Sequence, residues 1–173
     1  MLRFIYGGYD AVHAHPYEML RQTGVPDYTL LLVKSPAYFY LNGIRTETEP
    51  QTAVLFPPHA PVRYGSVGTP YKDDWLHFVA EGEEELLGEL NLPVQTPLAL
   101  PDLPSLSGCL RVLVRKRRAG GRYQEEAEDA LLRGLLYGLS DQIQEQSDRR
   151  WERPYFRCLL YTSPSPRDTE RSR

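Results

Sequence analysis

The chain has 173 residues, a formal net charge of −3, 41% hydrophobic residues and 25% charged residues. These values are typical of one soluble folded domain, and the charge excludes an overall electrostatic attraction to nucleic acid. No apolar run approaches the length of a membrane span, and the N-terminus lacks the pattern of a signal peptide. The two cysteines lie far apart in the chain and form no disulfide framework. We therefore expect a cytoplasmic protein with no membrane partner.

The first eighty residues are rich in aromatic and β-branched residues, glycine and proline. The stretch 27–33 predicts a strand, because it is a short apolar run bounded by turn residues; 52–58 predicts another, ended by two prolines, and 73–80 a third, because large side chains alternate along it. Between two further strand-like segments stands Asn42-Gly43, a dipeptide that favours the type I′ turn of a β-hairpin. Several short strands at this spacing predict a small antiparallel barrel or sandwich.

Helical patterns follow after residue 80. Residues 81–90 predict a short amphipathic helix, 91–104 form a proline-rich connector, and 105–118 predict a second helix that ends in a basic run. The strongest helical pattern covers 123–146, where an apolar residue recurs every fourth position. These residues are Ala127, Leu131, Leu135, Leu139 and Ile143. The chain is thus expected to belong to the α+β class, with its helices after its strands.

The histidines are the obvious candidates for a metal site. His13 and His15 are one residue apart, a spacing that can hold a metal from one face of a strand. However, the stretch 7–20 around them reads as an arm or loop, and no third ligand follows at a suitable distance. His59 stands alone among prolines. We therefore expect no metal and no cofactor.

Nucleophilic catalysis has no clear candidate in this sequence. Ser66 is not set in the strand–turn–helix elbow that exposes a catalytic serine, and Cys109 lies on the apolar side of a predicted helix. The basic run 115–118 is short, lacks interleaved aromatic residues, and suits the C-terminal end of a helix better than a nucleic-acid site. We expect that the protein is not an enzyme.

Aromatic residues concentrate on the predicted strands, at Tyr28, Tyr38, Tyr40, Tyr64 and Trp75. Rings with polar tips suit the interior of a barrel that holds one small ligand, where hydroxyl groups and an indole N–H orient it. Alternatively, these rings simply fill the barrel. Composition does not decide between the two.

Several short motifs, in this order and spacing, resemble the N-terminal effector-binding domain of AraC-family transcriptional regulators. They are Arg21-x-x-Gly24-x-x-Asp27-Tyr28-x-Leu30, Asn42-Gly43, the VLFPP segment 54–58, Tyr64, and the WLHF segment 75–78. The resemblance covers about the first eighty residues by motif and extends more loosely to the segment WERPYF at 151–156. It implies a cupin-like antiparallel β-barrel of the jelly-roll type, followed by helices that dimerise.

The resemblance also implies a set of effector-binding residues. By position, Lys34, Tyr64, Asp73 and Trp75 match places where sugar-sensing members contact their ligand, and we add Arg21 and His77 from their motif positions. The implied partner is a small-molecule effector, a sugar or a related polar metabolite, bound without metal. The chain departs from the family at Ser35-Pro36, where a glycine turn is usual, which places the local geometry at Lys34 in question.

The resemblance further implies a homodimer and a domain organisation. We expect an effector-binding barrel at 1–80, a helical dimerisation region at 81–147 with Leu131, Leu135, Leu139 and Ile143 in its interface, and a linker at 148–157. In the family this linker leads to a helix-turn-helix domain, through which alone the protein would bind DNA. Instead, 158–173 resembles a translated sequencing adapter, so we expect a non-native tail on a fragment.

Two other functions remain open from the sequence. A stand-alone cupin metalloenzyme, an isomerase or dioxygenase, would need three or four ligands converging from the barrel strands, which the four scattered histidines do not provide. A sugar-binding module without a regulatory partner is compatible with residues 1–157.

Overall fold

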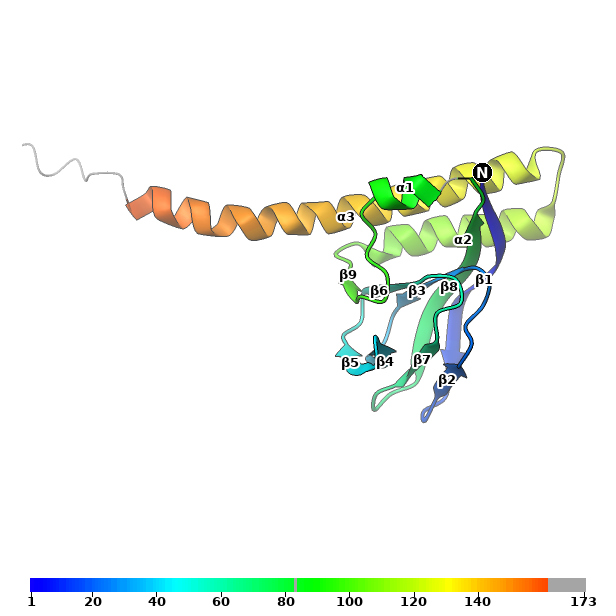
Figure 1. The fold of residues 1–173 in the computed structure, drawn as a ribbon, viewed down its shortest axis with the longest axis horizontal. Helices are drawn as coiled ribbons and strands as arrows, with labels where there is room; N and C mark the ends of the chain where they lie inside the picture. The colour runs from blue at the N-terminus through cyan, green and yellow to red at the C-terminus, as the bar shows by residue number, and fades with distance from the viewer. Residues whose placement is uncertain (83, 162–173) are drawn as a thin grey trace, which may run out of the picture.

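The computed structural model describes residues 1–82 and 84–161 and consists of two antiparallel sheets capped by helices (Figure 1). The strands are β1 (Leu2–His13), β2 (Glu18–Arg21), β3 (Tyr28–Val33), β4 (Ala37–Leu41), β5 (Ile44–Thr48), β6 (Thr52–Phe56), β7 (Val62–Ser66), β8 (Tyr71–Ala80) and β9 (Leu98–Ala99). The helices are α1 (Glu84–Glu89), α2 (Leu103–Ala119) and α3 (Gln124–Tyr161). One sheet has the order β1-β8-β3-β6-β9 and the other β2-β7-β4-β5. The expected α+β class with a cupin-like barrel before the helices is confirmed.

The five-stranded sheet is buried on both faces, which explains the nearly continuous apolar pattern of β3 and β6. Leu31 and Val33 of β3 face the opposite sheet, inside the barrel, whereas Leu30 and Leu32 face the helices. Successive side chains of a strand point to opposite faces, so one strand contributes to both cores.

The predicted hairpin is present between β4 and β5. Asn42 has a φ of 50° and Gly43 a φ of 82°, as a type I′ turn requires at both central residues. The two strands pair from Leu41↔Ile44 to Ala37↔Thr48. This local turn chemistry was readable from the dipeptide alone.

The expectation that the stretch 7–20 forms an arm or loop is wrong. Its first half belongs to β1, which pairs antiparallel with β8 along the edge of the larger sheet, and its end belongs to β2. Register shifts between Phe4 and Tyr6, and between Gly8 and Ala11, interrupt the pairing. Such bulges insert extra residues and break the two-residue alternation by which a strand is recognised in sequence.

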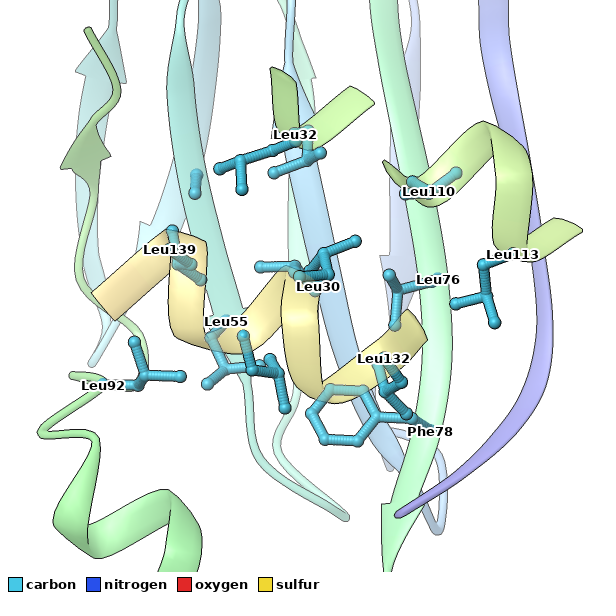
Figure 2. Close-up of a cluster of buried hydrophobic side chains, with 14 of the residues drawn as sticks. Leu30, Leu32, Leu55, Leu76, Phe78, Leu92, Leu110, Leu113, Leu132 and Leu139 are labelled. Atoms are coloured by element: carbon cyan, nitrogen blue, oxygen red, sulfur yellow. The ribbon is translucent and has the colours of Figure 1, made fainter. Parts of the chain in front are cut away.

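A leucine-rich core joins the helices to the outer face of the five-stranded sheet. Figure 2 shows side chains of α3, such as Leu132 and Leu139, pointing toward Leu30 and Leu55 of the sheet. Leu110 and Leu113 of α2 complete the same cluster and have no exposed surface. Burial of this many leucines provides the main attachment of α2 and α3 to the barrel.

Helix α3 is much longer than the predicted 123–146 and extends beyond the barrel (Figure 1). The expected linker at 148–157 falls within the range of this helix, and the proposed domain boundaries stay a prediction. Of the expected tail, residues 162–173 lie outside the described residues. Within the described residues, no helix is both long and apolar enough to span a membrane.

Candidate functional site

A pocket with a volume of about 140 Å³ opens inside the barrel, between the two sheets. A cavity of about 150 Å³ holds one benzene molecule, so the space suits a single six-membered ring. Aromatic and polar side chains dominate its wall. The lining residues are His13, Tyr17, Met19, Arg21, Val25, Thr29, Leu31, Val62, Tyr64, Asp73, Trp75 and His77.

Strand β8 supplies a row of three polar or aromatic groups to the pocket. Asp73, Trp75 and His77 alternate along the strand, so all three side chains point into the barrel. Gly8 of β1 lies directly opposite Trp75, and a Cβ there would come within 2.9 Å of the indole Nε1. The glycine therefore leaves the space in which the indole lies.

Asp73 is a buried carboxyl group without a hydrogen-bond partner for Oδ1 among the described residues. The residue is only 1% exposed. Burial is the largest of the influences that together raise its pKa to about 7; the nearby Asp74 carboxyl also raises the pKa, while the Tyr71 hydroxyl and Lys34 lower it. The Tyr71 hydroxyl lies close to Asp73 but also lacks a partner in hydrogen-bond geometry. An unpaired buried polar group of this kind is costly unless a water molecule or a ligand in the pocket satisfies it.

His77 is held by two neighbours on its Nδ1 side. Asp27 Oδ1 lies 2.6 Å from Nδ1, and Thr29 Oγ1 lies 3.2 Å from it. The ring stacks on Tyr6 at a centroid distance of 4.3 Å and meets Trp75 edge-on. Burial lowers the pKa of His77, although Asp27 opposes this effect, so the imidazole is neutral at pH 7.

Tyrosine rings close the side of the pocket formed by the smaller sheet. Tyr17 and Tyr64 lie at a centroid distance of 6.3 Å, and Tyr71 packs against both. Burial raises the pKa of Tyr64 and of Tyr71, so both hydroxyls keep their protons and can donate hydrogen bonds. Arg21, an exposed residue at the end of β2, adds a cation to the same wall.

A family model described as the AraC-like ligand binding domain matches residues 11–136, which is most of the chain. The chain belongs to the AraC-like ligand-binding domain family. The resemblance found in the sequence is thereby confirmed, and the pocket lies in the part of the chain that the match covers. A search of proteins with curated functions gave no match.

Solved structures of two regulators resemble this AraC-like domain. The AraC-like transcriptional activator CuxR has 17% sequence identity and a TM-score of 0.51, over 76% of this chain and 49% of CuxR. Apo ToxT K231A from Vibrio cholerae strain SCE256 has 11% identity and a TM-score of 0.49, over 86% of this chain and 56% of ToxT. Wild-type ToxT from that strain, with a bound unsaturated fatty acid, has 13% identity and a TM-score of 0.46, over 83% of this chain and 55% of ToxT. The chain thus spans about half of the length of these proteins.

The AraC-like domain brings five of the six predicted effector-binding residues to one pocket. They are Arg21, Tyr64, Asp73, Trp75 and His77. The sixth, Lys34, does not line it. Its Nζ lies 2.6 Å from Asp74 Oδ1 and 2.8 Å from Asp10 Oδ1, on the side of the sheet that faces α2. Whether any of the six binds an effector stays a prediction.

The four leucine and isoleucine positions predicted for dimerisation lie on the sheet-facing side of α3. Leu135 and Leu139 have no exposed surface, and Leu131 and Ile143 are partly buried against the same core. These side chains therefore pack against the barrel of their own chain. The dimer itself stays a prediction.

Three of the five strand aromatics lie outside the barrel interior, so for these three neither of the two alternatives, ligand contact or filling of the barrel, holds. Tyr28 stacks on Phe78 in the helix-side core. Tyr38 and Tyr40 pack on the outer face of the smaller sheet under Arg45 and Arg63. Alternation decides this outcome, because Phe39, between the two tyrosines, takes the interior position.

Several pocket residues were not predicted from the sequence, including Tyr17, Met19, Thr29 and Leu31. All four occupy alternate positions, 17 and 19 around β2 and 29 and 31 on β3. On β3, the two-residue alternation is visible in the sequence. The pairing register, which decides which of the two faces points into the barrel, is not. Among the described residues, no group of three or more histidine, cysteine, aspartate or glutamate side chains could hold a metal ion.

Proposed function

We propose that this chain is the effector-sensing domain of a transcriptional regulator and that it binds a small, hydroxyl-rich molecule, a sugar in chemical class, in the barrel pocket. The observation that carries the proposal is the pocket itself. It combines a ring-sized volume with the Trp75 indole and the unsatisfied carboxyl of Asp73. Aromatic faces with convergent hydrogen-bonding groups are what a polar ring requires.

Binding, not turnover, is the activity that we propose. The polar groups of the pocket can each make hydrogen bonds to a ligand, and an AraC-like family membership supports a sensor. Recovery of the bound compound unchanged after long incubation with the protein would support this proposal. Chemical conversion of the compound would contradict it.

In the whole protein, we propose that effector binding controls DNA binding by another domain. The strands that line the pocket also carry the core beneath the helices: Leu31 faces the pocket, while Leu30 and Leu32 face α2 and α3. A ligand that binds one arrangement of β3 and β8 better than another would shift the helices with them. We also propose a homodimer, which light scattering across a concentration series would test.

The binding proposal is tested by calorimetric titration of the chain with pentoses and hexoses, with oleate as a comparison ligand. A matched pair of variants locates the site. Tyr64→Phe removes a hydroxyl inside the pocket, and Tyr38→Phe removes one from the outer face. We expect the first change to weaken sugar binding roughly tenfold, as for one lost hydrogen bond, and the second to leave it unchanged.

Two outcomes would contradict the proposal. If both variants bind the sugar equally well, the site lies elsewhere. If oleate binds and no sugar does, the ligand class is wrong, because a chain of eighteen carbons has none of the hydroxyl donors that we propose for Asp73.

A further inference from the structure

The contact between Asp27 and His77 joins two residues 50 positions apart in the sequence, and both are almost fully buried. Asp27 is 6% exposed and His77 is 5% exposed. Asp27 stands immediately before β3, while His77 lies on β8 with Thr29 as its register partner. A close carboxylate–imidazole contact in a dry environment restricts where the imidazole proton can lie.

The geometry selects one tautomer of the neutral ring. An ionised carboxylate only accepts hydrogen bonds, so at 2.6 Å from Asp27 Oδ1 the Nδ1 atom must be the donor. Nε2 of a neutral imidazole is then unprotonated and an acceptor. The Thr29 hydroxyl, 3.2 Å from Nδ1, can accept from the same N–H group and does not change this assignment.

The groups around His77 leave Nε2 for the pocket. Tyr6 of β1 stacks on the face of the ring, and Trp75 of β8 meets it edge-on. Arg21 of β2 is near enough to lower the pKa of His77, which further favours the neutral form. Every hydrogen bond that the described residues make to this ring is on Nδ1, and the residue lines the pocket.

Asp73 provides a second acceptor at the other end of the same strand face. His77 is four positions further along β8, or about 13 Å along the backbone, and Trp75 lies midway between the two residues in the strand. Asp73 and His77 therefore present polar groups at two different points of the pocket wall, on either side of the Trp75 position.

We propose that Asp27 is a positioning residue for this pocket: it holds His77 as the Nδ1-protonated tautomer, so that Nε2 accepts a hydrogen bond from a ligand hydroxyl. The assignment rests on the proposed function for its ligand, but the tautomer is a property of the protein alone. It makes the pocket select a donor at this position, because a carbonyl or ether oxygen would face the Nε2 lone pair without a proton between them.

The first test is long-range ¹H–¹⁵N correlation NMR of the ligand-free full chain at neutral pH. The chain has four histidines, and the His77→Gln variant assigns the His77 signals. We expect Nδ1 to be protonated and Nε2 unprotonated in the wild type. In Asp27→Asn, whose amide can donate to Nδ1, we expect the opposite tautomer, whereas the matched control Thr29→Val keeps the wild-type tautomer.

The second test is titration of the same variants with the panel of pentoses and hexoses. We expect Asp27→Asn to weaken binding roughly tenfold or more, and Thr29→Val to have a smaller effect. Asp27→Asn could weaken binding either by disturbing the pocket structure or by changing the tautomer of His77. A structural disturbance alone would not reverse the tautomer, so the NMR measurement separates these two causes.

The outcomes are distinguishable from failure of the proposed function. An Nε2-protonated His77 in the wild type would overturn the inference, whether or not any sugar binds. Sugar binding that is equally tight in Asp27→Asn would also overturn it, while leaving the proposed function intact. If no sugar binds to the wild type, the proposed ligand class fails, and the tautomer in wild type and Asp27→Asn still decides the role of Asp27.

Discussion

Asp73 illustrates how a single residue can be poorly placed for folding and well placed for binding. Its carboxyl group is buried without a partner for Oδ1, beside the Tyr71 hydroxyl and on the same strand as the Asp74 carboxyl. Natural proteins retain such groups where a ligand completes the hydrogen bonding. The unpaired, buried oxygen of Asp73 therefore supports a binding site more strongly than the number of aromatic residues in the pocket does.

The pKa of Asp73 predicts a pH-dependent cost to stability. Burial raises this pKa to about 7 in the folded protein, above the value of 3.8 for an unperturbed group. Because the pKa of Asp73 is higher in the folded protein than in the unfolded chain, protonation of this carboxyl stabilises the folded state. This contribution to the free energy of unfolding is fully present below about pH 4 and is lost as the pH rises through 7. Asp73→Asn should raise the free energy of unfolding by up to about 4 kcal/mol above this range.

Urea denaturation of wild type and Asp73→Asn at about pH 5 and about pH 8 checks this prediction. The gain in stability should be larger at the higher pH. An equal gain at both values would mean that the Asp73 carboxyl does not titrate between them, and that its burial is relieved in solution.

At the scale of elements, an ion-pair network connects the barrel to α2. Lys34, after β3, contacts Asp74 of β8 and Asp10 of β1, and Asp10 in turn pairs with Arg111 of α2 at 2.6 Å. The Asp74 side chain has no exposed surface, and Lys34 is its ion-pair partner. This arrangement assigns Lys34 to the junction between sheet and helix.

Lys34→Met should therefore destabilise the protein without affecting ligand affinity. Removing one partner of a buried pair leaves an uncompensated charge and costs about 3–5 kcal/mol. Arg45→Met is the matched control, because Arg45 and Glu47 form an exposed pair, and we expect a change of less than about 1 kcal/mol. Thermal or urea unfolding gives the stabilities, and sugar titration gives the affinities. A Lys34→Met variant that stays stable but loses binding would restore the effector-binding role that the sequence resemblance implied.

At the scale of the whole molecule, barrel and helices share one core. The cluster in Figure 2 includes residues of β3, β6, β8, α2 and α3, so neither layer buries its apolar face without the other. The pocket lies on the opposite face of the same sheet. The pocket and the helix packing thus share strands β3 and β8.

We predict that the described part of the chain unfolds as one cooperative unit. Trp75 fluorescence reports the pocket, and far-ultraviolet circular dichroism reports chiefly the helices. In a Trp151→Phe background, where Trp75 is the only tryptophan left, both signals should give the same denaturation midpoint. Separate midpoints would show that the helices detach from the barrel before it unfolds.

Local patterns in the sequence were sufficient for the general order of barrel strands before the long helices, the Asn42-Gly43 turn and the family. Each depends on residues close together in the chain, where backbone preference and hydrophobic period act directly. The bulged β1 was missed because the interruption that bends it also removes the alternation from its sequence.

The site depended on tertiary structure in a way that no local pattern records. The pairing register places Trp75 opposite Gly8 and turns Lys34 away from the pocket. A shift of one residue in the pairing of a strand would move each of its side chains to the opposite face of the sheet. The contact of Asp27 with His77 exists only because β3 pairs with β8. The sequence alone determined the strand-then-helix order and the chemistry available to a pocket. Only tertiary structure decided which of those groups face one another, because side-chain contacts across a sheet are set by long-range pairing.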